Sequence, residues 1–311
     1  MLLKKIMLLA AKVEATPGTA VALADPDGAF NAYQLAPTVT IPVEHREGPG
    51  GFDRLAGVPG TQAFSLSFRT DVEWDGTAAL PDWAEVLLPA CGYVKDGNTF
   101  KPKSAPPGSQ GVTTLTMAEY CGPGKRKIGR GCVGTFNFVL PTGKMAYFDW
   151  QFQGVWVNDE DIAMLTPVFP SDDIFRFADA SAQFGGLPMC LSQLTLDAGN
   201  EILLRECPGD TSGFESGVIV DRYGSVSGDP ESVLVATDDR YGKWRSGTQG
   251  PLDVVMNGPN GANIHVIMPA AQIENIDDSD RGKLKTDGIT FRPQKNGSVT
   301  DDSVRIIFNN A

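Results

Sequence analysis

Alternation of apolar and polar residues is the feature that most constrains the fold of this chain. Between Phe64 and Trp74 the apolar side chains share one face, and the other face carries Ser65, Ser67, Arg69, Asp71 and Glu73. Successive side chains of a strand point to opposite sides of a sheet. This segment is therefore predicted to be a strand with one buried face and one wet face.

The same period of two recurs along most of the sequence. Residues 145–156 alternate aromatic with polar side chains, and residues 141–144 join them to a strand over 135–140 as a tight hairpin. A second hairpin is predicted at residues 198–200, between strands over 191–197 and 201–205. Further strands are expected over 217–223, 252–256, 264–268 and 304–308. The fold class is therefore predicted to be mainly β.

Helix is expected in two short places. Over residues 81–91 one apolar stripe at helical spacing consists of Trp83, Val86, Leu87 and Ala90. Pro81 and Gly92 suit the two ends of this helix, whose stripe is expected to pack on the sheet. A second helix start is indicated at 229–231, where Asp229 supplies a cap and Pro230 the first helical position.

The order of strands, short helix and further strands occurs twice. At 311 residues the chain has the length of about two domains. We predict two tandem domains, over 37–165 and 186–311, joined by a linker over 166–185. Residues 1–36 are predicted to form an N-terminal arm, because no partner strand is evident for them. A loop over 43–62, rich in glycine, proline and charge, interrupts the first domain, and loops this long usually carry function.

The net charge of −12 limits the possible partners. Residues 1–165 hold 14 basic and 17 acidic side chains, whereas the remainder holds 12 basic and 21 acidic. A surface this acidic repels phosphates, which argues against specific nucleic-acid binding. The one basic run, residues 125–127 with Arg130, is interpreted as a solvated loop. No membrane partner is expected, since no stretch approaches about 18 apolar residues.

Sequence signatures of catalysis are missing. The two histidines, His45 and His265, have no acid or nucleophile at motif spacing, and no phosphate-binding loop or zinc-protease motif occurs. The acidic run 277–282 lacks the later glutamate of a calcium loop. The five cysteines are scattered without metal-ligand spacing and fit free thiols in a reducing cytoplasm. We expect no enzyme activity, no cofactor and no metal.

Three motifs, taken in order, resemble a known family. Residues 12–19 read Lys-Val-Glu-Ala-Thr-Pro-Gly-Thr, and residues 87–92 read Leu-Leu-Pro-Ala-Cys-Gly. Residues 130–136 read Arg-Gly-Cys-Val-Gly-Thr-Phe and lead into an aromatic strand that ends at Trp156. Their sequence and spacing resemble the tail tube proteins, or major tail proteins, of long-tailed, siphovirus-like bacteriophages. Residues 190–310 resemble a second copy of this domain by element order only.

The resemblance implies β-sandwich or half-barrel domains, each with a short flanking helix. One sheet of each domain would close with its neighbours into a barrel around a lumen. Copies of the chain would form trimeric pseudo-hexameric or hexameric rings that stack into a tail tube, assembled in the host cytoplasm. With two domains in one chain, the trimer is favoured. Other implied partners are the tail terminator, the distal tail protein, the tape measure protein, and DNA that passes without specific binding.

Two sets of residues are predicted to serve these roles. The lumen candidates lie on the wet strand face and are Ser65, Ser67, Asp71 and Glu73. The inter-ring stacking candidates lie in the long loop and are His45, Arg46, Glu47, Phe52, Asp53 and Arg54.

Two other classes stay open. One is another β-rich tail component, such as a distal tail hub or fibre protein. The second is a carbohydrate-binding or adhesive β-sandwich, in which Trp150 and Trp156 would form a sugar platform. The period-two alternation of these aromatic residues with polar ones favours a place in the core over a platform.

Overall fold

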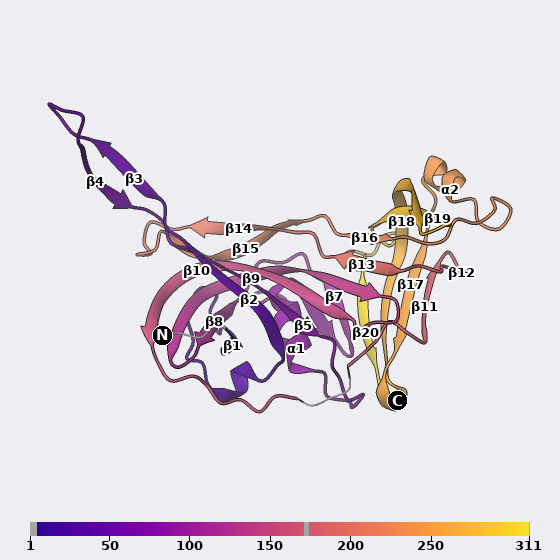
Figure 1. The fold of residues 1–311 in the computed structure, drawn as a ribbon, viewed down its shortest axis with the longest axis horizontal. Coiled ribbons are helices and arrows are strands. Elements are labelled where there is room, and N and C mark those ends of the chain that lie inside the picture. The colour runs from indigo at the N-terminus through magenta and orange to yellow at the C-terminus, as the bar shows by residue number, and fades with distance from the viewer. Residues whose placement is uncertain (1–4, 171–173, 311) are drawn as a thin grey trace.

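Antiparallel strands make up most of the chain, as the alternation predicts (Figure 1). A computed structural model describes residues 5–170 and 174–310. Residues 1–4 of the predicted arm, 171–173 of the predicted linker, and Ala311 lie outside these ranges. The mainly β fold class is confirmed.

A long hairpin forms the centre of the first half. Its strands are β9 (Lys125–Pro141) and β10 (Tyr147–Asp161), which pair along almost their whole length. β10 also pairs with β5 (Ala63–Asp71), and β5 pairs with β2 (Ala32–Thr40). The other edge of β9 is shared by two strands. β8 (Leu115–Cys121) pairs with its first part, and β13 (Gln193–Asp197) pairs with its last part.

The second half contains a similar arrangement. β17 (Gln249–Asn257) pairs with the long strand β18 (Asn263–Arg281), whose other edge is shared by β20 (Arg305–Asn309) and β19 (Leu284–Pro293). β16 (Ser225–Gly228) connects β19 to β13, so the hydrogen-bonded sheet continues from one half into the other. β11 (Ala180–Phe184) and β12 (Leu187–Pro188) end it beyond β17.

The remaining elements are short. β6 (Tyr93–Asp96) and β7 (Thr99–Pro102) form a hairpin that pairs with β20. Two ribbons stand apart from the main sheet, β3 (Val43–Glu47) with β4 (Arg54–Pro59), and β14 (Asn200–Glu206) with β15 (Phe214–Arg222). The helices are α1 (Asp82–Ala90) and α2 (Arg240–Ser246), with single 3-10 turns at Asp25–Gly28 and Pro259–Gly261.

Aromatic side chains fill the core between α1 and the β5–β10–β9 sheet. Phe138 and Phe148 stack across the β9–β10 pair with ring centroids 4.1 Å apart. Trp83 of α1 lies 5.1 Å from Phe148. Phe308 of β20 contacts Trp83 at 6.0 Å, so the C-terminal strand completes the core of the first half. Large aromatic rings contribute most of the buried apolar area here.

The N-terminal arm was predicted wrongly. Residues Met7–Val13 form β1, which pairs with β8 along seven residues, and Leu9, Ala10 and Ala11 are buried. The run is apolar on both faces because both faces are covered. It therefore lacks the alternation that identifies a half-exposed strand.

The turn predicted at residues 198–200 is also wrong. Ala198 continues along β9, since its N–H donates to the carbonyl of Phe136 at 2.9 Å. The Asn200 side chain then donates to the carbonyls of Cys91 and Gly134, both at 2.8 Å. The chain thus leaves the main sheet for the β14–β15 ribbon instead of reversing, and β13 and β14 pair with different strands.

No helix begins at residues 229–231. The Asp229 carboxylate accepts hydrogen bonds from the backbone N–H groups of Ser192 and Gln193 at 2.8 and 3.2 Å, which anchors β13. Helix α2 starts eleven residues further on and is capped by Asp239, which accepts from the Gly242 N–H at 2.8 Å. Gly247 ends α2 at φ +65°, a conformation that glycine adopts without strain.

Candidate assembly surfaces

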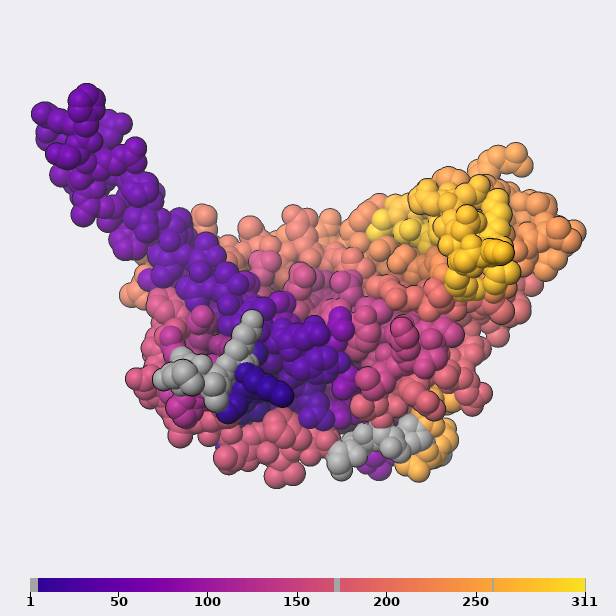
Figure 2. Space-filling view, in the orientation of Figure 1, coloured from indigo at the N-terminus to yellow at the C-terminus, as the bar shows by residue number. Residues whose placement is uncertain are grey.

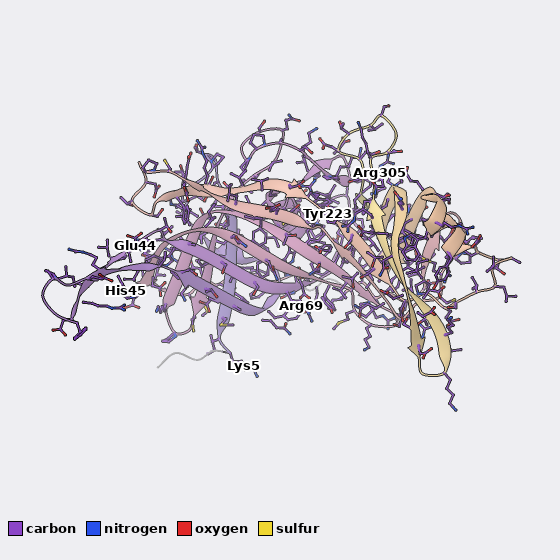
Figure 3. All side chains as sticks on the ribbon, turned by 90° about the horizontal axis from the view of Figure 1, so that it is seen from above. Lys5, Glu44, His45, Arg69, Tyr223 and Arg305 are labelled. Atoms are coloured by element: carbon purple, nitrogen blue, oxygen red, sulfur yellow. The ribbon has the colours of Figure 1, made fainter. Side chains whose placement is uncertain are left out.

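The predicted loop over residues 43–62 is a β-hairpin that stands clear of the body (Figures 1 and 2). We call residues 43–59 the arm; this hairpin is distinct from the N-terminal arm that was predicted over residues 1–36. It continues the β2–β5 pair, and at its base the Gly60 N–H donates to the Pro42 carbonyl at 2.7 Å. Glu44 and His45 lie on the arm, well separated from Arg69 on the body (Figure 3). The prediction of an irregular loop was wrong, because the alternation in β3 and β4 is short and broken by a bulge.

The arm exposes apolar side chains that its own chain does not cover. Phe52 at the tip is fully exposed. Val43, Leu55 and Val58 are each a little less than half exposed. A two-stranded hairpin is at best marginally stable alone in water. Exposed apolar residues gathered on one projecting element mark a surface that contacts another molecule.

The charged side chains of the arm are also without partners. Among the described residues, none of the predicted stacking residues His45, Arg46, Glu47, Asp53 and Arg54 makes an ion pair or a side-chain hydrogen bond. Elsewhere many charged groups are paired; Arg130, for example, bonds Asp210 at 2.6 Å. The arm therefore places both apolar and charged groups where only another molecule can engage them.

The wet face predicted on β5 exists and extends onto β10. Ser65 lies opposite Gln153, and Ser67 lies opposite Gln151, and all four are partly or fully exposed. Arg69 is the single cation in residues 63–71 of β5 and residues 147–155 of β10. The surface is thus made mainly of small polar groups and carboxylates.

Hydrogen bonds hold the charges of this face in place. Arg69 donates to both oxygens of Asp149, from Nε at 2.6 Å and from Nη2 at 2.7 Å, and this pairing raises the pKa of Arg69. The Tyr33 hydroxyl donates to Asp71 Oδ1 at 2.6 Å. Burial, and then the hydrogen bond and charge of Asp71, raise the pKa of Tyr33. The cation is neutralised by its partner, which leaves Asp71 as the uncompensated charge.

Glu73 does not lie on this face. β5 ends at Asp71, the alternation stops there, and Glu73 is only 3 % exposed. Its carboxylate accepts two hydrogen bonds from Asn31 Nδ2, at 3.1 and 2.9 Å, and its carbonyl accepts from Trp83 Nε1 at 3.0 Å. Its assignment as a lumen residue was therefore wrong, and it instead joins the helix to the strand end.

The helix residues and the two tryptophans lie on the inner side of the sheet. Trp83 and Leu87 are buried, and Val86 is partly buried and packs against the same core. Trp150 is 1 % exposed, with its Nε1 bonded to Thr70 Oγ1 at 2.8 Å, and Trp156 is partly buried against the core. The buried indole of Trp150 offers no platform to a sugar, so this alternative keeps only Trp156.

Glu14, a residue of the first family motif, has a position that the sequence analysis missed. Its buried carboxylate accepts four hydrogen bonds, two of them from the N–H groups of Gly18 and Gly131, each at 2.8 Å. The other two come from the hydroxyls of Thr114 at 2.7 Å and Thr116 at 2.8 Å. An acid close to an apolar run was the available signal, but three of its four partners, Thr114, Thr116 and Gly131, lie one hundred residues or more away.

Other site types are missing from the part of the chain that the structure describes. No group of three or more potential metal-ligating side chains occurs within residues 5–170 and 174–310. Among the helices that the structure describes, none is long and apolar enough to cross a membrane.

These features describe a β-rich protein with a projecting hairpin and a polar sheet face. Residues 6–292 match the family model described as phage tail tube protein. Because the match covers most of the sequence, the chain belongs to the phage tail tube protein family, and the predicted resemblance is confirmed. It is accordingly a structural component of the phage virion. No curated protein matches the chain.

Proposed function

We propose that copies of this protein form rings that stack into the phage tail tube, and that the arm makes the contact between neighbouring copies. The observation that carries the proposal is the arm itself, with an uncovered Phe52 and unpaired charges. A contact between an arm and a different surface of the next copy is heterologous. Heterologous contacts close into rings or continue as filaments, which are the two elements of a tube.

The ends of the main sheet support closure between subunits. Its path runs from β2 at one end to β12 at the other. In the ranges that the structure describes, no strand pairs with the outer edge of β2. An open edge presents unpaired backbone N–H and carbonyl groups, which a strand of the next copy can satisfy. Pairing of sheet ends around a ring would produce a continuous barrel.

The strand pattern favours three copies in each ring. β9 and β18 are both long strands; β9 pairs with β10 and β18 with β17 on one edge, the latter over residues 263–272, and each is shared between two shorter strands on the other edge. This similarity supports two tube-type repeats in one chain, with the boundary between β10 and β11. A trimer would then supply six repeats, whereas a hexamer is expected if the second repeat lies outside the barrel.

We infer further that the wet face of β5 and β10 lines the lumen. Its groups are small, polar or acidic, and its one cation is already held by Asp149. Carboxylates repel DNA phosphates, so DNA can slide past without being bound during ejection. Other tail proteins, namely the terminator, the distal tail protein and the tape measure protein, would contact the ends and the inside of the tube.

Removal of the arm tests the assembly role. The two ends of the arm are held together by the hydrogen bond from the Gly60 N–H to the Pro42 carbonyl. Residues 43–59 can therefore be replaced by two glycines without stretching β2 or β5. We expect this variant to be folded and monodisperse but unable to form tubes, as seen by circular dichroism and electron microscopy. Leu284→Ala, which trims an exposed residue at the β18–β19 turn, is the control and should form tubes. Tubes of normal length from the armless variant would contradict the proposal.

A further inference from the structure

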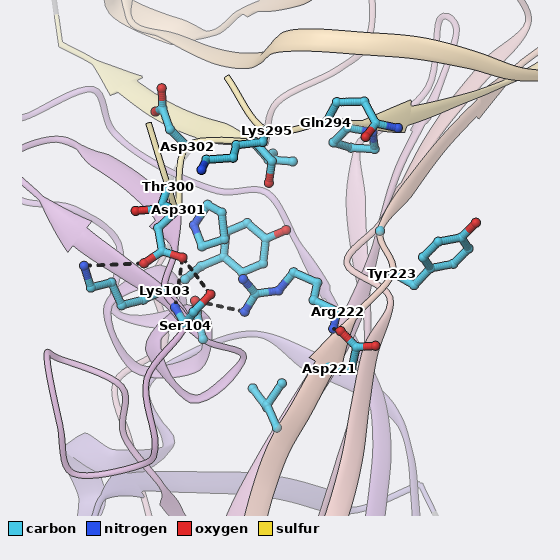
Figure 4. A pocket seen from close by; sticks show the side chains of 18 of the residues that line it. Lys103, Ser104, Asp221, Arg222, Tyr223, Gln294, Lys295, Thr300, Asp301 and Asp302 are labelled. Atoms are coloured by element: carbon cyan, nitrogen blue, oxygen red, sulfur yellow. Dashed lines mark hydrogen bonds and ion pairs between the residues drawn. The ribbon is translucent and has the colours of Figure 1, made fainter. Parts of the chain in front are cut away.

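An open groove lies beside β15, β18 and the segment that precedes β20 (Figure 4). Its volume is about 830 Å³, and it is formed by segments far apart in the sequence. One side consists of the start of β6, the segment after β7 and the end of β15. The other side consists of parts of β18 and β19 and the segment 294–304 that precedes β20. A cavity of this size accommodates several side chains of a peptide segment.

The groove combines an apolar lining with two cations that have no acidic partner among the described residues, Arg222 and Lys295. Tyr93 and Val112 are buried in its lining, and the ring of Tyr93 lies 5.0 Å from the guanidinium of Arg222. Arg222 points into the groove, and its chain neighbours Asp221 and Tyr223 also belong to the lining (Figure 4). The Nη1 group of Arg222 has no hydrogen-bond partner among the described residues. Lys295 is exposed and makes no ion pair within those residues.

Three of the four acids in the groove lining are paired, and the fourth, Asp221, accepts only the backbone N–H of Arg222 among the described residues. Asp302 bonds Arg305 at 2.6 and 2.5 Å, and Glu274 pairs with Arg292. Asp301 accepts from the Ser104 hydroxyl at 2.7 Å and lies 3.6 Å from the Lys103 ammonium group. The lining thus holds four basic and four acidic side chains, and Lys295, which has no acidic partner among the described residues, is available to a carboxylate of an incoming segment. Its chemistry fits an aromatic side chain followed by a carboxylate.

The tip of the arm carries that combination. Residues 48–51 are Gly-Pro-Gly-Gly, which makes the tip narrow, and Phe52 and Asp53 follow. Phe52 is fully exposed, and Asp53 and Glu47 have no side-chain partner in the described part of the chain. The arm projects away from the body in both views of the ribbon, so its own groove is out of reach (Figures 1 and 3).

We propose that the groove receives the arm tip of a neighbouring copy, with Phe52 inserted beside Arg222 and Asp53 paired with Lys295. The inference rests on the proposed self-assembly and names the surface that the arm occupies. An aromatic ring against a guanidinium is favourable, and a buried aromatic anchor beside a charge pair is a common centre of binding energy. Each copy has one arm and one groove at different places, so the contact repeats from copy to copy.

Photo-crosslinking tests where the tip lies. Phe52→p-benzoylphenylalanine keeps an aromatic side chain at the tip, and Leu284→p-benzoylphenylalanine is the control at an exposed turn. Tubes assembled from equal amounts of ¹⁵N-labelled and unlabelled protein are irradiated, digested and analysed by mass spectrometry. We expect mixed heavy–light peptides that join position 52 to residues 219–224 or 292–304. The control should not yield them.

The possible results distinguish a failure of the groove proposal from a failure of the tail tube proposal. Crosslinks from position 52 to another surface, in tubes that form normally, would overturn the groove and leave the tail tube proposal intact. If the unmodified protein forms no tubes, the tail tube proposal fails and the groove contact falls with it.

Charge exchange tests the pairing at the tip. Asp53→Lys and Lys295→Asp should each raise the protein concentration needed for assembly about tenfold, and the two together should return it to within about threefold of the original. Asp280→Lys, which reverses an exposed charge of β18 outside the groove lining, is the control and should change it little. A double variant that assembles no better than the single variants would contradict the pairing.

Discussion

Glu14 allows a sharp test of how the first family motif stabilises the fold. Its carboxylate accepts the N–H of Gly18 at Oε2 and the N–H of Gly131 at Oε1, and each oxygen also accepts one threonine hydroxyl. Glu14→Ala leaves both buried N–H groups without an acceptor. An unsatisfied buried donor costs about 1–3 kcal/mol, so the alanine variant should lose about 2–6 kcal/mol of unfolding free energy.

Glu14→Gln separates the hydrogen bonds from the packing of the side chain. Glutamine keeps one oxygen but presents an NH₂ group to the other glycine N–H, whichever way the amide is turned. One glycine N–H is then left without an acceptor instead of two, so the loss of unfolding free energy should be about half that of Glu14→Ala. Urea unfolding of the monomer, followed by tryptophan fluorescence, measures both. Equal losses in the two variants, or a loss below about 1 kcal/mol for alanine, would refute this account of the motif.

Two further predictions concern pH and the lumen. Hydrogen bonds from Arg305, and then from Asn296, lower the pKa of Asp302 to about 2, so its stabilising effect is complete above pH 4 and is lost between about pH 4 and pH 2. Asp302→Asn should therefore cost about 2 kcal/mol at pH 7 and nothing near pH 2 in urea unfolding, and an equal cost at both would contradict this. Phage that carry Gln151→Lys should assemble tubes but eject DNA slowly at low salt, with recovery at high salt, whereas Gln151→Met should eject normally. Normal low-salt ejection from the lysine tubes would place this face outside the lumen.

Elements with one wet face could be predicted from the sequence. β5 and β10 alternate because one side meets the aromatic core and the other meets water, and the stripe of α1 reflects the same contrast. The polar residues Ser65, Ser67 and Asp71 were located for this reason. In each case the period of the side chains depends on local geometry alone.

Elements whose surroundings are set by distant segments could not be predicted. β1 is covered on both faces, so its run shows no period, and its partner β8 lies about one hundred residues away. Glu73 follows the end of β5, where hydrogen bonds from Asn31 decide its burial. The groove is built from segments of both halves, and no local pattern marks any of them.

The composition of the arm shows how a free subunit can avoid premature association. An exposed hairpin edge invites pairing with any other strand, and charged side chains along it oppose that pairing. Glu44, Arg46, Glu47 and Arg54 occupy β3 and β4, and the tip between them is rich in glycine and proline. Phe52 alone offers a large apolar contact at the tip, so nonspecific contacts gain little. A surface that buries the ring and also matches the charges gains both contributions, so the proposed contact would favour a complementary site over nonspecific ones.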